Sequence, residues 1–134
     1  MTQAIDLIVL IDDDKMDNFA HRRLIEKAGF AKEILEFEYA DEALEFFKTK
    51  DRPVGVIFLD VNMPRMNGFE FLEAYERLPE SQRARTVVMM LSTSSSDKDM
   101  NAAKNFKSVQ AYHSKPLTVE LLEQVRQQFL DDGA

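Results

Sequence analysis

The chain has 134 residues, a formal net charge of −7 and no cysteine; 45% of the residues are hydrophobic and 31% are charged. These values are ordinary for one soluble globular domain, so we expect a single domain over residues 1–134. The acidic balance argues against nucleic acid or an anionic membrane as a direct partner, and the lack of cysteine excludes disulfides, zinc–thiolate sites and cysteine nucleophiles.

The N-terminus lacks the pattern of a signal peptide. It reads MTQAIDLIVLIDDD, which has no basic segment, and its short apolar run ends in carboxylates. No stretch of the sequence is long enough to span a membrane. These features predict a cytoplasmic protein.

Five apolar runs follow one another along the chain and predict strands. They cover residues 5–11, 34–40, 54–59, 86–91 and 109–113. The first, third and fourth runs are almost continuously apolar, which is typical of central strands buried on both faces. The second run alternates between apolar residues and glutamates, and the fifth is short and mixed, so we expect these two at the edges of a sheet.

Amphipathic stretches with helical spacing alternate with these runs and predict five helices. The first carries Phe19, Leu24, Ile25 and Ala28 on one side and ends at Gly29. The later helices are marked by the apolar sets Ala43, Leu44 and Phe47; Phe71, Leu72, Tyr75 and Leu78; Met100, Ala103 and Phe106; and Leu121, Leu122, Val125 and Phe129.

This alternation predicts an α/β protein whose parallel sheet is covered by helices on both faces. Right-handed crossovers, together with the second and fifth strands at the edges, favour the strand order 2-1-3-4-5. The expected fold is therefore a flavodoxin-like, doubly wound (βα)5 sandwich.

Carboxylates follow two strands that this order makes neighbours. Asp12, Asp13 and Asp14 follow the first strand, and Asp60 ends the third. Two unit charges about 5 Å apart at an effective dielectric constant near 20 repel by roughly 3 kcal/mol, so such a cluster must bind a proton or a cation. Hard oxygen ligands point to Mg²⁺, with Mn²⁺ as a substitute.

Simpler interpretations explain part of this pattern. Asp14 is expected to be a helix N-cap, with Asp17 three residues later. A solvated acidic loop accounts for the three consecutive aspartates but not for Asp60 at the end of an apolar strand. A calcium-binding EF-hand does not fit, because Met16 and Asp17 occupy the third ligand position and the glycine position.

The fourth and fifth strands add polar groups at the same edge. The fourth is followed by LSTSSS, which brings hydroxyls next to Asp60, and the fifth by SKP, which brings Lys115. A lysine and a divalent ion are what an anionic phosphoryl group requires around it. We therefore interpret Asp60 as a nucleophile that accepts a phosphoryl group as an acyl phosphate.

Four motifs in this order resemble the receiver domain of two-component response regulators. They are LIDDD, FLDVNMPRMNG, MLS and AYHSKPLT, and the resemblance covers residues 5–130. It implies a signalling module, similar to the chemotaxis regulators, that takes a phosphoryl group from a histidine kinase or a His-containing phosphotransfer protein. It also implies a protein-binding face that switches for a downstream protein target, which the sequence does not identify.

The resemblance implies roles for single residues. Asp60 is expected to be the phosphoacceptor, and Asp12 and Asp13 the acid pair for Mg²⁺ together with Asp60 and the backbone carbonyl of Asn62. Lys115 is expected to pair with the phosphoryl oxygens and to be joined to Pro116 by a cis bond.

The same resemblance implies roles for residues at three further positions. Ser92, rather than Thr93, occupies the switch hydroxyl position, Tyr112 is the switch aromatic, and Gly68 is the turn glycine after the third strand. Ser92 as a simple strand cap and Tyr112 as an ordinary edge aromatic remain open alternatives. His21 and His113 are expected to be ordinary surface or strand residues.

Two other functions compete with signalling. A small-molecule phosphohydrolase could use Asp60 as its nucleophile, but the haloacid-dehalogenase type has a second acid where this chain has Asn62, and no cap insertion is visible. A nucleotide-binding domain is disfavoured because the chain has neither GxGxxG nor a P-loop. We expect Mg²⁺-dependent self-phosphorylation and self-dephosphorylation without turnover of a separate substrate. Since only DDGA follows the last helix, we also expect a stand-alone receiver.

Overall fold

A five-stranded parallel sheet forms the centre of the molecule, with its strands in the order β2-β1-β3-β4-β5. The computed structural model describes residues 5–50, 52–83, 87–93 and 96–133. The strands are β1 (Ile5–Ile11), β2 (Ala31–Phe37), β3 (Val56–Asp60), β4 (Val87–Ser92) and β5 (Val109–Ser114). The predicted fold class and strand order are confirmed.

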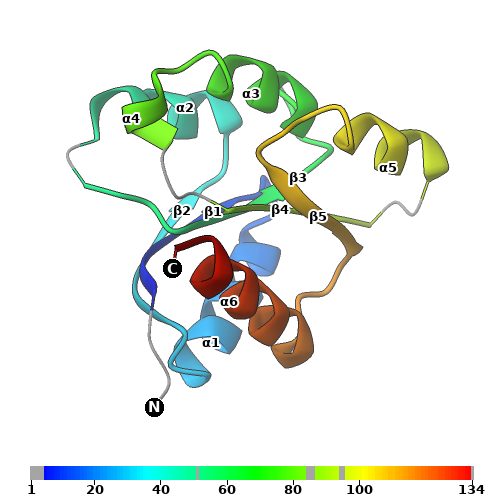
Figure 1. The fold of residues 1–134 in the computed structure, drawn as a ribbon. Helices are drawn as coiled ribbons and strands as arrows, with labels where there is room; N and C mark the ends of the chain where they lie inside the picture. Colours follow the sequence, from blue (N-terminus) through cyan, green and yellow to red (C-terminus); the bar gives the residue numbers. More distant parts are fainter. Residues whose placement is uncertain (1–4, 51, 84–86, 94–95, 134) are drawn as a thin grey trace.

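Helices cover both faces of the sheet, as Figure 1 shows. On one face lie α1 (Lys15–Lys27) and α6 (Val119–Gly133), and on the other α2 (Ala40–Thr49), α3 (Gly68–Tyr75), α4 (Glu80–Arg83) and α5 (Asp97–Ala103). The sequence pattern misses α4, because this single turn buries no side chain and so has no apolar face. Among the described helices, none is both long enough and apolar enough to cross a membrane.

The core consists of two apolar layers, one on each side of the sheet. Successive residues of β1 alternate between them, since side chains of a strand point to opposite faces. Leu7 and Val9 face the layer under α2 and α3, whereas Ile8 and Leu10 face the layer under α1 and α6. Central strands β1 and β3 are buried along almost their whole length. Polar side chains at their carboxyl ends can therefore reach the rim of the sheet.

Several strands differ from the expected bounds, and the second differs most. The strand expected over residues 34–40 lies at Ala31–Phe37, because its pairing with β1 begins at Ile5 opposite Ala31 and ends at Ile11 opposite Phe37. Ala40 instead begins α2. Residue 86 of the expected fourth strand lies outside the described residues, as do residues 1–4 and 134 of the expected domain.

The inner face of α1 is only partly the apolar face that the sequence predicts, because Ile25 is buried and Leu24 packs against the core, but the other two expected residues are not buried. Phe19 is 53% exposed and Ala28 is also exposed, whereas Asn18, His21 and Ile25 are the buried residues of this helix. Two polar side chains replace the expected apolar ones because both find hydrogen-bond partners at the edge of the sheet. The prediction that His21 is an ordinary surface or strand residue is therefore wrong.

Candidate functional site

Three carboxylates meet at the carboxyl ends of β1 and β3. Asp12 follows β1 directly and Asp60 is the last residue of β3, and the two strands are neighbours in the sheet. Asp12, Asp13 and Asp60 each offer a carboxylate oxygen, and these atoms all lie within 4.8 Å of one another. Asp12 and Asp60 are buried and Asp13 is exposed, so the cluster opens to solvent on one side. This donor set fits a hard divalent cation such as Mg²⁺.

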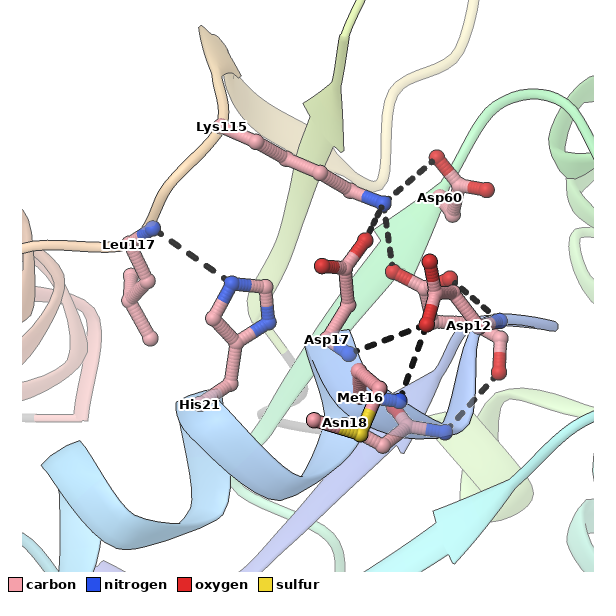
Figure 2. A network of polar contacts seen from close by, with 9 residues as sticks. Asp12, Met16, Asp17, Asn18, His21, Asp60, Lys115 and Leu117 are labelled. Atoms are coloured by element: carbon pink, nitrogen blue, oxygen red, sulfur yellow. Dashed lines mark hydrogen bonds and ion pairs between the residues drawn. The ribbon is translucent and has the colours of Figure 1, made fainter.

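Lys115 reaches this cluster from the end of β5. Its backbone N–H donates to the carbonyl oxygen of Ser92 at 2.8 Å, which ties the residue to the end of β4. Its Nζ lies 2.6 Å from Asp12 Oδ2, 2.7 Å from Asp17 Oδ2 and 3.4 Å from Asp60 Oδ1 (Figure 2). The bond from Lys115 to Pro116 is cis, as expected.

Burial and like charge change the protonation of the acids. Burial raises the pKa of Asp60 to about 6, and the nearby charge of Asp12 adds to this effect, while Lys115 opposes it. Burial also raises the pKa of Asp12, although hydrogen bonds from Lys115 and from the Asp14 N–H act in the opposite direction. Burial works against the charge of Lys115, but the hydrogen bonds to Asp12 and Asp17 outweigh it and raise the lysine pKa.

The comparisons with known proteins agree with this geometry. Residues 8–127 match the family model of the response regulator receiver domain. The chain belongs to the receiver domain family. It is 30% identical over 122 residues to a probable methanogenesis regulatory protein, FilR2, of Methanothrix harundinacea, with 87% of this chain and 76% of that protein covered.

Two further relatives match this chain over nearly their whole length. A chemotaxis protein CheY homolog of Campylobacter jejuni is 25% identical, with 95% of this chain and 94% of that protein covered. The crystal structure of a two-component response regulator from Cytophaga hutchinsonii superposes with a TM-score of 0.88 at 29% identity, covering 96% of this chain and 99% of that one. This receiver is thus a phosphoacceptor signalling module, and nothing found among its relatives supports the phosphohydrolase alternative.

The connection after β3 explains why this receiver has a glycine at position 68. A Cβ atom there would lie 2.5 Å from the backbone oxygen of Asp60 and 3.1 Å from the Cα of Val61. The Gly68 N–H also donates to the Val61 carbonyl at 2.8 Å, and Asn67 and Glu70 form a capping box at the start of α3. The start of α3 therefore packs directly against the backbone of Asp60.

The same connection is anchored at Arg65. This residue has a positive φ of 69°, and its guanidinium group donates to both carboxylate oxygens of Asp41, at 3.2 and 2.6 Å. Its Cζ also lies 3.8 Å from the centre of the Tyr39 ring. Together these contacts tie the exposed loop that carries Asn62 to the start of α2.

The two expected switch residues lie on neighbouring strands. Ser92 is fully buried at the end of β4, directly after Leu91, which is opposite Asp60, whereas Thr93 is exposed. Tyr112 lies on β5 opposite Met90, is partly buried and packs against the layer under α2 and α3. Ser92 therefore lies on the strand next to Asp60, and Tyr112 lies one strand further away, on the edge strand β5.

Three polar residues of α1 complete the site, and their sequence pattern alone did not lead us to expect them there. Asn18 donates through Nδ2 to the backbone oxygen of Asp12 at 2.8 Å, and Asp17 accepts from Lys115 at 2.7 Å. His21 Nε2 accepts from the Leu117 N–H at 3.5 Å, which requires a neutral imidazole. Burial lowers the pKa of His21 and so favours this neutral form. Their spacing along one helix, with Asn18 and His21 three residues apart, is the signal that could have revealed a common face.

Proposed function

We propose that Asp60 accepts a phosphoryl group from a phosphohistidine of a histidine kinase or a His-containing phosphotransfer protein. The observation that carries this proposal is the position of Asp60 at the end of a buried central strand, 3.4 Å from Lys115 and next to two further carboxylates. One carboxylate oxygen forms a bond to phosphorus as the bond from phosphorus to the donor nitrogen breaks, and the imidazole leaves. The product is an aspartyl phosphate.

The acidic cluster is proposed to hold Mg²⁺, or Mn²⁺ as a substitute, through Asp12, Asp13, Asp60 and the backbone carbonyl of Asn62. A bound ion would neutralise charge on the transferring phosphoryl oxygens and orient them. The Asp12 carboxylate is already oriented in the absence of an ion, because its Oδ1 accepts from the Asp14 N–H at 2.9 Å. This contact fixes the carboxylate at the mouth of the site.

Lys115 and Ser92 are proposed to respond to the new phosphoryl group. The ammonium group of Lys115 can pair with a phosphoryl oxygen, and the hydroxyl of Ser92 can turn to donate to another. Movement of Ser92 would leave space behind β4 that the Tyr112 ring can fill by turning inward. The surface formed by α5, β5 and α6 would then change shape for a downstream protein target.

This role implies a cytoplasmic protein of one domain over residues 1–134, without direct binding of nucleic acid or membrane. Self-phosphorylation from small phosphodonors and self-dephosphorylation would both depend on Mg²⁺, with no separate substrate turned over. Because a phosphorylated aspartate reverts to the same carboxylate on hydrolysis, the module can be reused for signalling.

The proposal is tested by intact mass spectrometry after incubation with acetyl phosphate and Mg²⁺. The wild-type protein should gain the mass of one phosphoryl group, and Asp60→Asn should gain none. Asp6→Asn is the matched control, since it removes one exposed carboxylate at the other end of the sheet and should behave like wild type. Phosphorylation of Asp60→Asn to the wild-type level would show that another residue is the acceptor.

A further inference from the structure

Lys115 is held by α1 as well as by the acidic cluster. Its Nζ lies 2.7 Å from Asp17 Oδ2 and 2.6 Å from Asp12 Oδ2, but 3.4 Å from Asp60 Oδ1 (Figure 2). The lysine side chain is only 10% exposed, so these contacts are poorly screened by solvent. Asp17 belongs to the first turn of α1 and is not one of the three carboxylates whose oxygens converge.

With a metal ion bound, Asp12 would face two cations. A divalent ion held by Asp12, Asp13 and Asp60 needs the same carboxylate that Lys115 contacts through Oδ2. The ion and the ammonium group also repel each other at short range. If Asp12 and Asp60 were the only anions near Lys115, binding of the ion would weaken both lysine contacts at once.

We propose that Asp17 is a positioning residue that holds Lys115 beside the site while Asp12 binds the metal. Asp17 supplies a carboxylate outside the converging set, so that both cations can face Asp60 together. This inference rests on the proposed function for the identity of the metal and deepens it, because it assigns a role to a residue of α1.

The surroundings of Asp17 fit such a role. Asn18, the next residue, is fixed by its hydrogen bond to the Asp12 backbone, and His21, one turn later, accepts from the Leu117 N–H. The first two turns of α1 are thus attached to the end of β1 and to the segment that follows Lys115. Asp17 lies on the same part of the helix, so its backbone is held near both segments, and its carboxylate reaches Lys115 from there.

The first test is the Mg²⁺ affinity of the metal-free protein, measured by calorimetry. Asp17→Asn should weaken Mg²⁺ binding by about fivefold or more, because Lys115 then competes with the ion for Asp12. The control is Asp14→Asn, which removes the same charge nearby and preserves the N-cap, since asparagine caps helices as well as aspartate does. Its affinity should change by less than about twofold; equal weakening in both variants would overturn the proposal.

A double-mutant cycle separates the lysine from a general effect of charge. In a Lys115→Ala background, Asp17→Asn should no longer weaken Mg²⁺ binding, because the competing ammonium group is absent. If the substitution weakens binding in this background as strongly as in the wild type, Asp17 acts on the ion directly and the positioning role is wrong.

The ammonium group itself gives a readout that does not depend on phosphorylation. In ¹⁵N NMR spectra at saturating Mg²⁺, the Nζ protons of Lys115 should exchange slowly with water in the wild type and rapidly in Asp17→Asn. Equally rapid exchange in both would overturn the proposal. If Asp60 is phosphorylated but Asp17→Asn binds Mg²⁺ as tightly as the wild type, the role of Asp17 is refuted. The proposed function then remains intact.

Discussion

At the scale of single residues, the charge on Asp60 is costly because the side chain is buried next to another carboxylate. Its side chain is 8% exposed, and burial together with the Asp12 charge raises its pKa from 3.8 to about 6. The native state therefore binds a proton on Asp60 more tightly than the unfolded state does. Stability from this group is fully present below pH 3.8 and is lost as the pH rises through about 6.

Replacement of Asp60 by asparagine should remove this penalty. In the absence of metal, Asp60→Asn should raise the free energy of unfolding at neutral and higher pH by about 2 kcal/mol. The gain should shrink as the pH falls from about 6 toward 3.8, where the wild-type carboxyl is protonated in both states. Urea unfolding at a series of pH values measures this difference, and a variant no more stable than wild type at pH above 6 would contradict the assigned cause.

The residues at strand ends could be predicted, whereas those on α1 could not. Asp12, Asp60 and Lys115 lie at the carboxyl ends of parallel strands, and strand order alone brings such ends together. Asp17 meets Lys115 across 98 positions of sequence, and that contact depends on how α1 rests against the sheet. His21 looked like a surface residue because only the structure reveals its partner, the Leu117 N–H.

At the scale of elements, the connection from β3 to α3 determines where the backbone of Asp60 lies. Glycine at position 68 lets the first turn of α3 approach the Asp60 carbonyl, where a Cβ atom would lie 2.5 Å from the oxygen. Real Cβ atoms essentially never approach so closely, so any larger residue must displace the helix or the strand end. The helix start and the site are therefore coupled.

Two glycine substitutions test this coupling. Gly68→Ala should lower the free energy of unfolding by about 2 kcal/mol through the backbone clash and should also weaken Mg²⁺ binding. Gly29→Ala is the control: its φ of 63° makes alanine strained, but no atom lies within 4 Å of the added Cβ. It should cost about 1 kcal/mol and leave Mg²⁺ affinity unchanged. Equal effects of both on Mg²⁺ binding would contradict a specific role for Gly68.

Element types were predicted better than element bounds. The apolar runs identified all five strands, but β2 begins at Ala31 because pairing with β1 extends through two exposed residues, Lys32 and Glu33. Helix α5 ends at Ala103, so Phe106 lies beyond it and reaches the core from the following turn, where it stacks on Phe69. Such bounds depend on pairing and packing between elements, which sequence periodicity does not contain.

At the scale of the whole molecule, the sheet brings carboxylates together into an acidic cluster, and a cation bound there should stabilise the fold. Millimolar Mg²⁺ should raise the Tm of the wild type, because the ion binds the native state and relieves repulsion among its carboxylates. Asp13→Asn should raise the Tm without metal and abolish the effect of Mg²⁺. Differential scanning calorimetry measures both, and a wild-type Tm that Mg²⁺ does not change would contradict the metal site.

The proposed switch also involves the whole molecule. Beryllofluoride, which stands in for the phosphoryl group, should shift amide resonances beyond the acidic cluster, over residues 97–113 and in α6. Ser92→Ala should leave Asp60 phosphorylatable but reduce these shifts, because the hydroxyl that meets the phosphoryl group is missing. Tyr112→Ala should alter partner affinity with little effect on phosphorylation. Shifts confined to the acidic cluster would rule this switch out.

Locating the modification shows directly whether Asp60 carries the phosphoryl group. After phosphorylation with acetyl phosphate and Mg²⁺, reduction with borohydride converts an aspartyl phosphate to homoserine, which tandem mass spectrometry of peptides identifies by position. We expect homoserine at position 60 and unmodified aspartate at Asp12 and Asp13. Homoserine at position 12 or 13, with Asp60 unmodified, would contradict this expectation.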